Sequence, residues 1–371
     1  MNDEELAQVI ALRHDLHAHP ELSGKEERTR RVLMDFVQEH SDFKVVPCPD
    51  WFYACRHTEH PQAAPIAFRA DMDALPIAET MDLPYASTLP GVSHKCGHDG
   101  HSAALAGLSM ALAGKPLCRD VYLIFQPAEE VGIGAEMCVS LLKEKQIREI
   151  YAFHNLSGYP EGAVVYRKGL TQPASMGITL SFAGKESHAA DPEQGINPAE
   201  TIACLVLFLK DACRDQSKGL LLATVVQMEA GSRNFGISAG NGSLSVTLRA
   251  EAEEEMNRLK EALCSEAQKL ASAQHLKLSV SVADPFPETR NDDTCLNHVI
   301  CAAKKNGYPT INMPELWRAS EDFGCYLHQC PGAMFYLGND ETWPALHSET
   351  YDFNDRLLER AIRMFESLIQ P

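Results

Sequence analysis

Positive charge is scarce in this chain of 371 residues. Lys and Arg number 33 against 51 Asp and Glu, so the formal net charge is −18. Nucleic-acid affinity comes largely from clustered Lys and Arg, and this balance argues against such a partner. No uninterrupted apolar stretch is long enough to span a membrane, and the first residues lack the basic segment and apolar run of a secretory signal. We therefore expect no membrane partner either.

Paired cysteines are also missing. The twelve cysteines are scattered along the chain, and no Cys-x-x-Cys pair occurs. Without a secretory signal, the simplest interpretation is a cytoplasmic protein with reduced thiols. Apolar residues make up 45% of the chain, which is an ordinary globular composition. At about 150 residues per domain, the length predicts two domains.

Strands and helices alternate along the first part of the chain. Strands are predicted at 66–70, 121–125 and 150–153, with a buried helix rich in Ala and Leu over 103–113. Such alternation is typical of a parallel sheet covered by helices on both faces. The alternation resumes near the C-terminus. The predicted fold class is therefore α/β, with a mixed, largely parallel sheet.

The middle of the chain has a different pattern. Strand-like and helical segments are predicted in the order 175–182, 197–214, 243–249, 252–273 and 276–283. This β-α-β-α-β order predicts a small α+β domain inserted into the first one. Asp284-Pro285-Phe286-Pro287 is interpreted as the hinge back out. We expect one domain at 1–173 and 287–371, and the inserted domain at 174–286.

A dense run of metal-binding side chains lies between the first two predicted strands. Residues 93–102 read Ser-His-Lys-Cys-Gly-His-Asp-Gly-His-Ser. Imidazole and thiolate together suit zinc or a similar transition ion, whereas magnesium and calcium prefer oxygen. The two glycines let the backbone turn tightly enough for several side chains to converge. The run predicts a metal site, although an inert solvated loop can have the same composition.

Other candidate side chains follow predicted strands. Asp71 and Asp73 follow the first strand, Glu129 and Glu130 follow the second, and His154 follows the third. Open parallel sheets bind ligands beyond the carboxyl ends of their strands. Paired acids are usually surface residues and a lone His is usually structural, but their joint placement predicts one site at this edge.

Glu129 and Glu130 are expected to have separate roles. Adjacent side chains in an extended turn point in different directions, so one carboxylate can bind a metal while its neighbour holds a water molecule. The metal lowers the pKa of that water and the neighbouring carboxylate takes its proton. The same group can then deliver the proton to a leaving amine. This is the arrangement that amide hydrolysis needs.

Six motifs occur in one order from near the N-terminus to near the C-terminus. They read Leu16-His17-Ala18-His19-Pro20-Glu21-Leu22-Ser23, Arg69-Ala70-Asp71-Met72-Asp73-Ala74-Leu75-Pro76, Cys96-Gly97-His98-Asp99-Gly100-His101, Gln126-Pro127-Ala128-Glu129-Glu130, His188-Ala189-Ala190 and Leu346-His347-Ser348. Together they resemble the M20 metallopeptidase family. The similar branch is that of amidohydrolases acting on N-acyl amino acids, which includes hippurate hydrolases, auxin-conjugate hydrolases and N-acetyl-diaminopimelate deacetylases.

The resemblance implies a domain of the zinc-exopeptidase type that binds two divalent transition-metal ions. Zn²⁺ is the natural ion for these ligands, and Mn²⁺, Co²⁺ or Ni²⁺ could serve. Glu129 would be the general base and then the general acid, and Asp73 would orient a ligating imidazole. His101 is assigned to the helix that follows. The implied ligands are Cys96, which would bridge the ions, His98, Glu130, His154 and His347.

The resemblance also implies a ferredoxin-like lid that forms homodimers. His188 would stabilise the oxyanion, in dimeric members at the partner subunit's site. Asn234 and Arg249 would bind the carboxylate or carbonyl of a small N-acyl amino acid. Relatives carry Asn-Val-Ile-Pro where this chain reads Asn-Phe-Gly-Ile-Ser from residue 234. The detailed substrate contacts are therefore expected to differ.

Several alternatives remain open at this point. The main hypothesis is a metal-dependent amidohydrolase that cleaves N-acyl (for example N-acetyl) amino acids. A dipeptidase or aminopeptidase of the same fold would instead require a free amine on its substrate. A metal-binding scaffold without activity would be expected to lack a ligand or the base, and this chain keeps them all. Residues 236–240 match G-x-S-x-G around Ser238, but a strand-like segment follows where a nucleophile elbow needs a helix.

Overall fold

The structure is a computed structural model that describes residues 1–214 and 219–370. The chain divides into two compact units, which are described separately. The larger unit comprises Met1–Thr171, Thr289–Leu316 and Glu321–Pro371, and the inserted unit comprises Gln172–Glu288 and Trp317–Ser320. Among the described residues, none of the helices combines the length and the apolar character that crossing a membrane would require.

The larger unit is built on an eight-stranded sheet with the order β1-β2-β4-β3-β5-β14-β6-β13. The strands β4, β3, β5 and β14 in its centre are parallel, while β1, β2 and β6 run antiparallel to their inner neighbours. This confirms the predicted mixed, largely parallel sheet. The strands are β1 (Lys44–Pro47), β2 (Phe52–Arg56), β3 (Ile66–Asp71), β4 (Val121–Gln126), β5 (Glu149–Leu156), β6 (Val164–Tyr166), β13 (Thr310–Asn312) and β14 (Gly332–Gly338). The short β7 (Leu170–Gln172) pairs separately with β12 (Thr289–Arg290).

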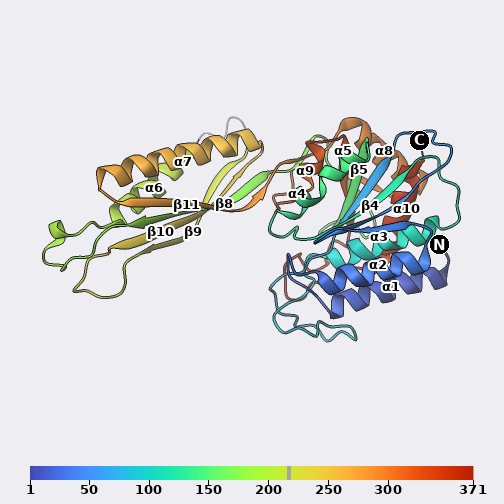
Figure 1. Cartoon of the computed structure of the whole chain (residues 1–371), viewed down its shortest axis with the longest axis horizontal. Helices are drawn as coiled ribbons and strands as arrows, with labels where there is room; N and C mark the ends of the chain where they lie inside the picture. Colours follow the sequence, from blue (N-terminus) through green and yellow to red (C-terminus); the bar gives the residue numbers. More distant parts are fainter. Residues whose placement is uncertain (215–218, 371) are drawn as a thin grey trace. The chain divides into compact units, whose positions relative to one another are not determined.

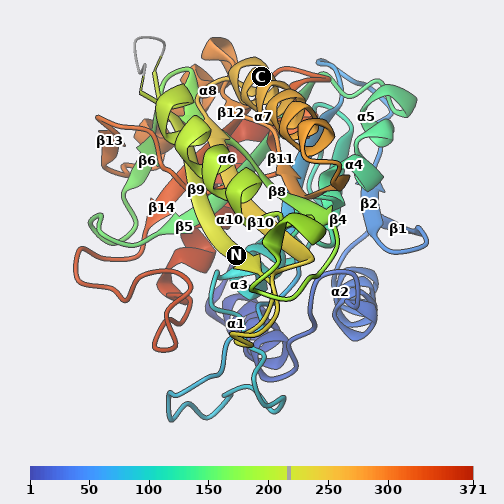
Figure 2. The same ribbon diagram turned by 90° about the vertical axis from the view of Figure 1, so that its left-hand side faces the viewer.

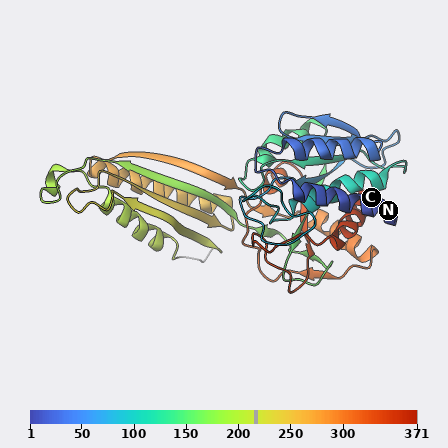
Figure 3. The same ribbon diagram turned by 90° about the horizontal axis from the view of Figure 1, so that it is seen from below.

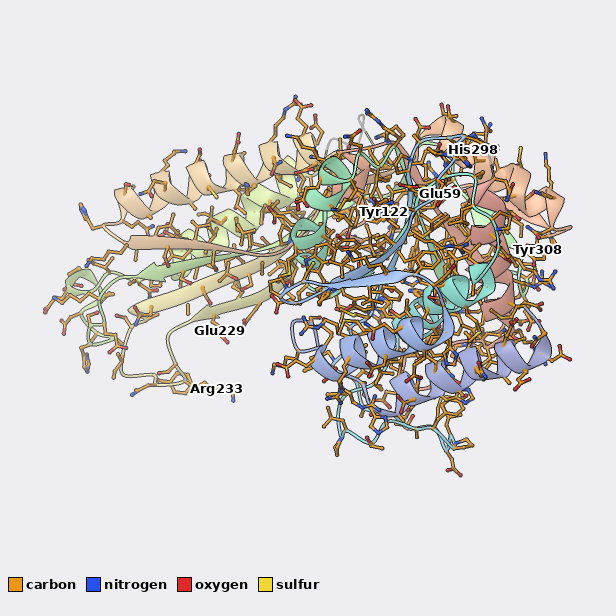
Figure 4. The ribbon with its side chains drawn as sticks, turned by 45° about the vertical axis from the view of Figure 1, so that its right-hand side comes forward. Glu59, Tyr122, Glu229, Arg233, His298 and Tyr308 are labelled. Atoms are coloured by element: carbon orange, nitrogen blue, oxygen red, sulfur yellow. The ribbon has the colours of Figure 1, made fainter. Side chains whose placement is uncertain are left out.

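Helices cover both faces of this sheet (Figure 1). Successive side chains of a strand point to opposite faces, so Phe68 of β3 packs in one apolar cluster and its neighbour Ala67 in the other. Tyr122 on β4, labelled in Figure 4, belongs to the second cluster. The first cluster packs against α1 (Asp3–Ala18), α2 (Glu27–His40), α3 (His98–Leu112), α8 (Asp293–Lys305) and α10 (Arg356–Ile369). The second packs against α4 (Gly134–Cys138), α5 (Ser140–Glu144) and α9 (Gly324–Leu327).

Helix α3 is buried along its whole length. Its many Ala side chains let it lie close to α1, α10 and the sheet, and each apolar side chain removed from water contributes up to about 2 kcal/mol. This packing fixes the N-terminal end of α3, which lies within the Cys/His run.

The inserted unit has the order βαββαβ, and its antiparallel sheet has the strand order β11-β8-β10-β9. This is the ferredoxin-like topology expected from the resemblance. Its elements are β8 (Ala174–Ala183), η1 (Pro192–Gln194), α6 (Ala199–Ala212), β9 (Leu221–Ala230), β10 (Asn241–Ala250), α7 (Glu253–Ala273) and β11 (Lys277–Phe286). Met176, Ile178 and Leu180 of β8 alternate with small or polar residues and face α6 and α7, which lie side by side in Figure 2.

Two details of the inserted unit differ from the sequence prediction. The order β-α-β-α-β omitted β9, an edge strand whose residues are mostly exposed and lack the alternation of a half-buried strand. The predicted hinge at 284–287 is also wrong in part, because β11 extends to Phe286. Asp284 adopts a positive φ of 49° there, and the pairing of β11 with β8 is irregular between Ala283 and Phe286. The prolines interrupt the strand locally without ending it.

Candidate metal centre

The candidate site forms where three parallel strands of the larger unit end. Asp71 is the last residue of β3, and the turn after β4 carries Glu129 and Glu130. His154 was predicted to follow β5, but it lies inside this strand, because β14 pairs with β5 as far as Leu156. The predicted meeting of these side chains at one edge nevertheless holds, since parallel strands end together there.

The Cys/His run enters this edge at the N-terminus of α3. Gly97 is the residue before the helix and has a φ of 98°, which residues other than glycine rarely adopt. A Cβ atom at this position would also collide with the side-chain amide of Asn155. Gly97 thereby lets the chain turn sharply between Cys96 and His98, and both of these side chains are buried at the site.

The five predicted ligands come together as two groups that share one sulfur atom. Cys96, His98 and His154 form one group, and Cys96, Glu130 and His347 form the other, with the ligand atoms of each group within 4.8 Å of one another. Cys96 Sγ lies 3.4 Å from His154 Nε2 and 3.3 Å from His347 Nε2. His98 Nε2 and His347 Nε2 lie 3.8 Å and 3.7 Å from Glu130 Oε1. This arrangement can hold two ions with a shared thiolate.

The imidazoles are oriented by partners on their other nitrogen. His98 Nδ1 lies 3.1 Å from Asp73 Oδ1, and His154 Nδ1 lies 2.7 Å from the carbonyl oxygen of Asn155. A proton on each Nδ1 leaves Nε2 with the lone pair that a metal requires. His347 is held through its backbone instead: its φ is 63°, and its N–H donates to the carbonyl oxygen of Lys95 at 2.7 Å.

Two buried polar atoms at the centre have no hydrogen-bond partner among the residues that the structure describes. They are His98 Nε2 and Glu130 Oε1. A buried polar atom without a partner costs about 1–3 kcal/mol, so such atoms need an explanation. Both atoms belong to the ligand groups. A transition-metal cation would satisfy both, and the donor set of one thiolate, three imidazoles and one carboxylate fits zinc and similar ions.

The electrostatics of the site also favour a cation. Burial lowers the pKa of His98, but Asp71, Asp73 and Glu130 outweigh it and raise that pKa to about 10. Burial raises the pKa of the Cys96 thiol, and the negative charge of Glu130 raises it further. A divalent cation bound here would favour the thiolate instead.

Glu129 lies between the proposed ligands and a group of buried acids. Its Oε2 atom lies 3.8 Å from His98 Nε2, and it forms one cluster with His98 and Glu130 and another with Glu321 and Asp322. Burial raises the pKa of Glu129 well above its usual range, and the charge of Glu321 adds to this effect. A carboxyl group with a raised pKa can hold a proton and release it, which suits an acid–base role.

Several buried residues of the site were missed by sequence reasoning. The Arg69 guanidinium donates to Asp71, Gln126 and Asp322 and also pairs with Glu321, so it ties β3 to β4 and to the segment before α9. Arg69 and Gln126 stand in the quoted motifs, but the acids at 321 and 322 had no local signal.

His101, left out of the ligands, has both ring nitrogens occupied, by Asp71 Oδ1 at 2.6 Å and Asn155 Oδ1 at 2.7 Å.

Glu26 supports the turn that carries Glu129, and its titration can be tested. Its Oε1 atom accepts a hydrogen bond of 2.8 Å from Ala128 N, and Ala128 has a φ of 50°. Burial, and then the charge of Asp73, raise the pKa of Glu26 to about 7. A folded-state pKa above the unfolded value means that this group's contribution to stability is lost as the pH rises through about 7.

Glu26→Gln should therefore stabilise the metal-free protein at alkaline pH, because it removes the buried charge and keeps an acceptor for Ala128 N. We expect the free energy of unfolding to rise on the order of 1–3 kcal/mol relative to the wild type at pH 8.5, with much less change at pH 5. Denaturant unfolding at the two pH values measures this. Glu27→Gln, an exposed neighbour, is the control. An equal effect of Glu26→Gln at both pH values would contradict the assignment.

His188 and Asn234 lie together at one end of the inserted unit. The loop after β8 and the loop between β9 and β10 meet there (green and yellow in Figure 3), where His188 bridges to Ile237 and Ala189 N donates to the carbonyl oxygen of Gly236 at 3.0 Å. Both predicted residues are exposed. Ser238 lies in the same connection and bonds to Ser187 Oγ at 2.8 Å, and β10 follows it instead of a helix. Ser238 is therefore not on a nucleophile elbow.

Arg249 lies at the opposite end of the same sheet. It pairs with Ser175 near the start of β8, and its guanidinium donates to the carbonyl oxygen of Arg318 and to Ser320 Oγ. The strand from residue 241 to residue 249 spans about 26 Å at the rise of an extended chain. Within one inserted unit, Arg249 therefore cannot contact the same small molecule as His188 and Asn234. The three predicted residues are not brought together within a single unit.

Comparisons with known proteins agree with this geometry. A family profile described as peptidase family M20/M25/M40 matches residues 67–370. The chain is 28% identical over 367 residues to the N-acetylcysteine deacetylase of Bacillus subtilis (strain 168), which covers 97% of this chain and 95% of that protein. It is also 28% identical over 367 residues to the N-acetyldiaminopimelate deacetylase of Exiguobacterium sibiricum, with 96% and 97% covered. The crystal structure of the Bacillus subtilis YXEP protein, described as a dinuclear metal-binding peptidase of the M20 family, matches with a TM-score of 0.84 at 25% identity, covering 100% of this chain and 98% of that one.

Proposed function

Because the chain belongs to peptidase family M20/M25/M40 and is thus a metal-dependent hydrolase of linear amides, we propose that it removes the acyl group from small N-acyl amino acids. One observation carries this proposal: two groups of three ligands share Cys96, and Glu129 lies beside them without being needed by either group. N-Acetyl amino acids are the first substrates to consider, because the relatives reported above are named for N-acetylcysteine and N-acetyldiaminopimelate.

Each residue of the centre has a proposed part in the reaction. Cys96, His98, Glu130, His154 and His347 would hold two divalent ions, of which Zn²⁺ fits the ligands best and Mn²⁺, Co²⁺ or Ni²⁺ could serve. Such ions would supply a lowered pKa for water and polarisation of the scissile carbonyl. Glu129 takes the proton of the attacking water and passes it to the leaving nitrogen. Asp73 holds the His98 ring in position, and Arg69 holds Asp71, whose Oδ2 atom lies 3.8 Å from His98 Nε2.

The inserted unit is proposed to complete the site as part of a homodimer. His188 would donate a hydrogen bond to the oxyanion, and Arg249 and Asn234 would bind the carboxylate or carbonyl of the substrate. Since Arg249 lies about 26 Å from the His188 end of its own unit, the substrate would contact Arg249 of one subunit and His188 and Asn234 of another. This division of the residues supports a site shared between two copies.

The edge of the inserted sheet supports the same assembly. Strand β9 is an edge strand, and its Val226 and Met228 are 67% and 59% exposed. Leu207 of the neighbouring α6 is 62% exposed. Glu229 and Arg233, labelled in Figure 4, mark the end of this edge and the loop that follows it. Burying these apolar side chains and pairing the free edge are gains that a second copy of the chain would provide.

The cysteines support a cytoplasmic location. All twelve are thiols and not disulfides, and Cys55, Cys96, Cys138, Cys295 and Cys330 are buried. A chain rich in thiols suits a reducing compartment.

The substrate class is tested by a panel that pairs N-acetyl and longer N-acyl amino acids with dipeptides of the same residues. We expect the purified, metal-loaded protein to hydrolyse N-acyl amino acids with kcat/KM at least about tenfold above the matching dipeptides, which corresponds to about 1.4 kcal/mol. Faster cleavage of the free-amine dipeptides would instead make the enzyme a dipeptidase. Cleavage of neither class would refute the proposed function.

Mixing two impaired variants tests the shared site. Glu129→Gln and His188→Ala should each be weakly active alone. If His188 acts on the other subunit, a mixed dimer contains one site with both native residues, and randomly mixed subunits regain about a quarter of wild-type activity. The measurement is activity after the subunits are unfolded and refolded together. Activity equal to the average of the two separate variants would mean that His188 acts within its own subunit or not at all.

A further inference from the structure

The His-Ala-His motif near the N-terminus has no role in the chemistry proposed above, yet its first histidine is completely buried. His17 lies near the end of α1, and both of its ring nitrogens face carboxylates. His17 Nδ1 lies 2.8 Å from Asp99 Oδ2, and His17 Nε2 lies 3.0 Å from Glu79 Oε2. A histidine that donates from both nitrogens is an imidazolium. His17 therefore joins two acidic residues from distant parts of the chain.

Each of these two acids is connected to a proposed metal ligand. Asp99 directly follows His98 in the first turn of α3. Glu79 accepts a hydrogen bond from the Lys95 ammonium, and Lys95 directly precedes Cys96. The Lys95 ammonium also donates to the carbonyl oxygen of Tyr351 at 2.8 Å, and the Lys95 carbonyl oxygen accepts the backbone N–H of His347 at 2.7 Å.

The network is ionic, and its cations are cut off from water. They are Arg13, His17 and Lys95, all fully buried. Arg13 Nε donates to Asp99 Oδ2 at 3.0 Å, its Nη2 donates to Asp352, and its Nη1 lies 3.4 Å from the partly exposed Asp355. Buried charges are tolerated only when they are paired and well hydrogen-bonded. Loss of one member therefore leaves an unpaired charge, and the surrounding segments must move to reach water.

We propose that His17 is a positioning residue for the metal pair: it holds Asp99 and, through Glu79 and Lys95, the segment from Lys95 to His98 and the backbone of His347. Three of the five ligands depend on this network, and one of them, Cys96, is shared by both ligand groups. A change at His17 should therefore weaken the binding of both ions, although His17 contacts neither ligand group. The inference rests on the proposed metal site and is independent of which amide is the substrate.

Metal affinity measured against a competing chelator tests this proposal. For His17→Gln, which cannot carry a charge, we expect the dissociation constants of both ions to rise about 10–100-fold, the usual effect of losing an outer partner of a metal site. The absorption band of a Co²⁺–thiolate bond should also weaken or shift, because Cys96 is displaced. His19→Gln is the matched control, since His19 belongs to the same motif and is half-exposed, with its ring near the carbonyl oxygen of Asp15 and the Asp15 carboxylate on the same helix.

The double variant His17→Gln/Glu79→Gln separates positioning from simple stability. It removes one positive and one negative charge together, so part of the metal affinity should return. It also provides the test if His17→Gln alone does not fold. Wild-type affinity and an unchanged cobalt spectrum in His17→Gln or, if that variant does not fold, in the double variant would overturn the inference, whatever happens to thermal stability. If the wild type itself binds no metal, the proposed function fails first, and the two failures are distinguishable.

Discussion

Glu129→Gln is expected to lose about 10²–10⁴-fold in turnover, the usual contribution of a general acid–base, while two equivalents of metal remain bound. The amide cannot accept the proton of the attacking water or return it to the leaving nitrogen. Metal binding should persist because neither ligand group requires Glu129. Turnover on an N-acyl amino acid and elemental analysis of the same sample measure both quantities.

The size of this effect depends on the surroundings of Glu129. It is buried beside Glu321 and Asp322, and Arg69 holds these acids in place. The substituted amide has nearly the shape of the carboxyl group, so the packing should survive. Glu136→Gln, an exposed change in the following helix α4, is the control and should retain full activity. Near-normal turnover of Glu129→Gln would remove Glu129 from its role.

Cys96→Ala is expected to abolish stoichiometric binding at both metal positions. Each ligand group contains Cys96, so its loss leaves two protein ligands in each. His154→Gln and His347→Gln each alter a single group, and we expect each of these variants to retain about one equivalent of metal. With both ions lost, several kcal/mol of transition-state stabilisation disappears, which is on the order of 10³-fold in rate.

A matched cysteine shows whether the thiol matters for its position or only for packing. Cys55 on β2 is also buried, but it lies in an apolar cluster away from the ligands. Cys55→Ala should keep both metal equivalents. If Cys96→Ala retained two equivalents of metal, the assignment of a shared thiolate would be wrong. The two ions would then have to be held by Glu130, Asp71 and the imidazoles alone.

Much of the proposed centre could be predicted from the sequence, because several of the ligands that the family resemblance implies also follow regular features. Cys96 and His98 stand two positions apart at a helix start, and Glu130 follows a strand that is parallel to its neighbours. Parallel strands end at one edge, so side chains beyond them must approach one another. The prediction at His154 was wrong because it ended the strand too early. β5 is longer than its apolar core, since the pairing with β14 continues past the histidine.

The supporting residues could not be predicted, for a physical reason. Arg69 and Asp322 are separated by 253 positions, and Arg13 and Asp352 by 339, so no local pattern links them. A buried charge appears in the sequence as an ordinary polar residue, and only the fold reveals its partner. The opposite placement of His188 and Arg249 likewise follows from the register of β10 against β8, which pairs Arg249 with Ser175 at the start of β8 and leaves His188 beyond its other end.

Metal content and deacylation measured on the same purified sample test the metal-dependent mechanism. We expect two equivalents of a divalent transition metal per chain, hydrolysis of N-acyl amino acids, loss of both on treatment with a chelator and their return when the metal is restored. Hydrolysis that continues at full rate after complete removal of metal would contradict the mechanism.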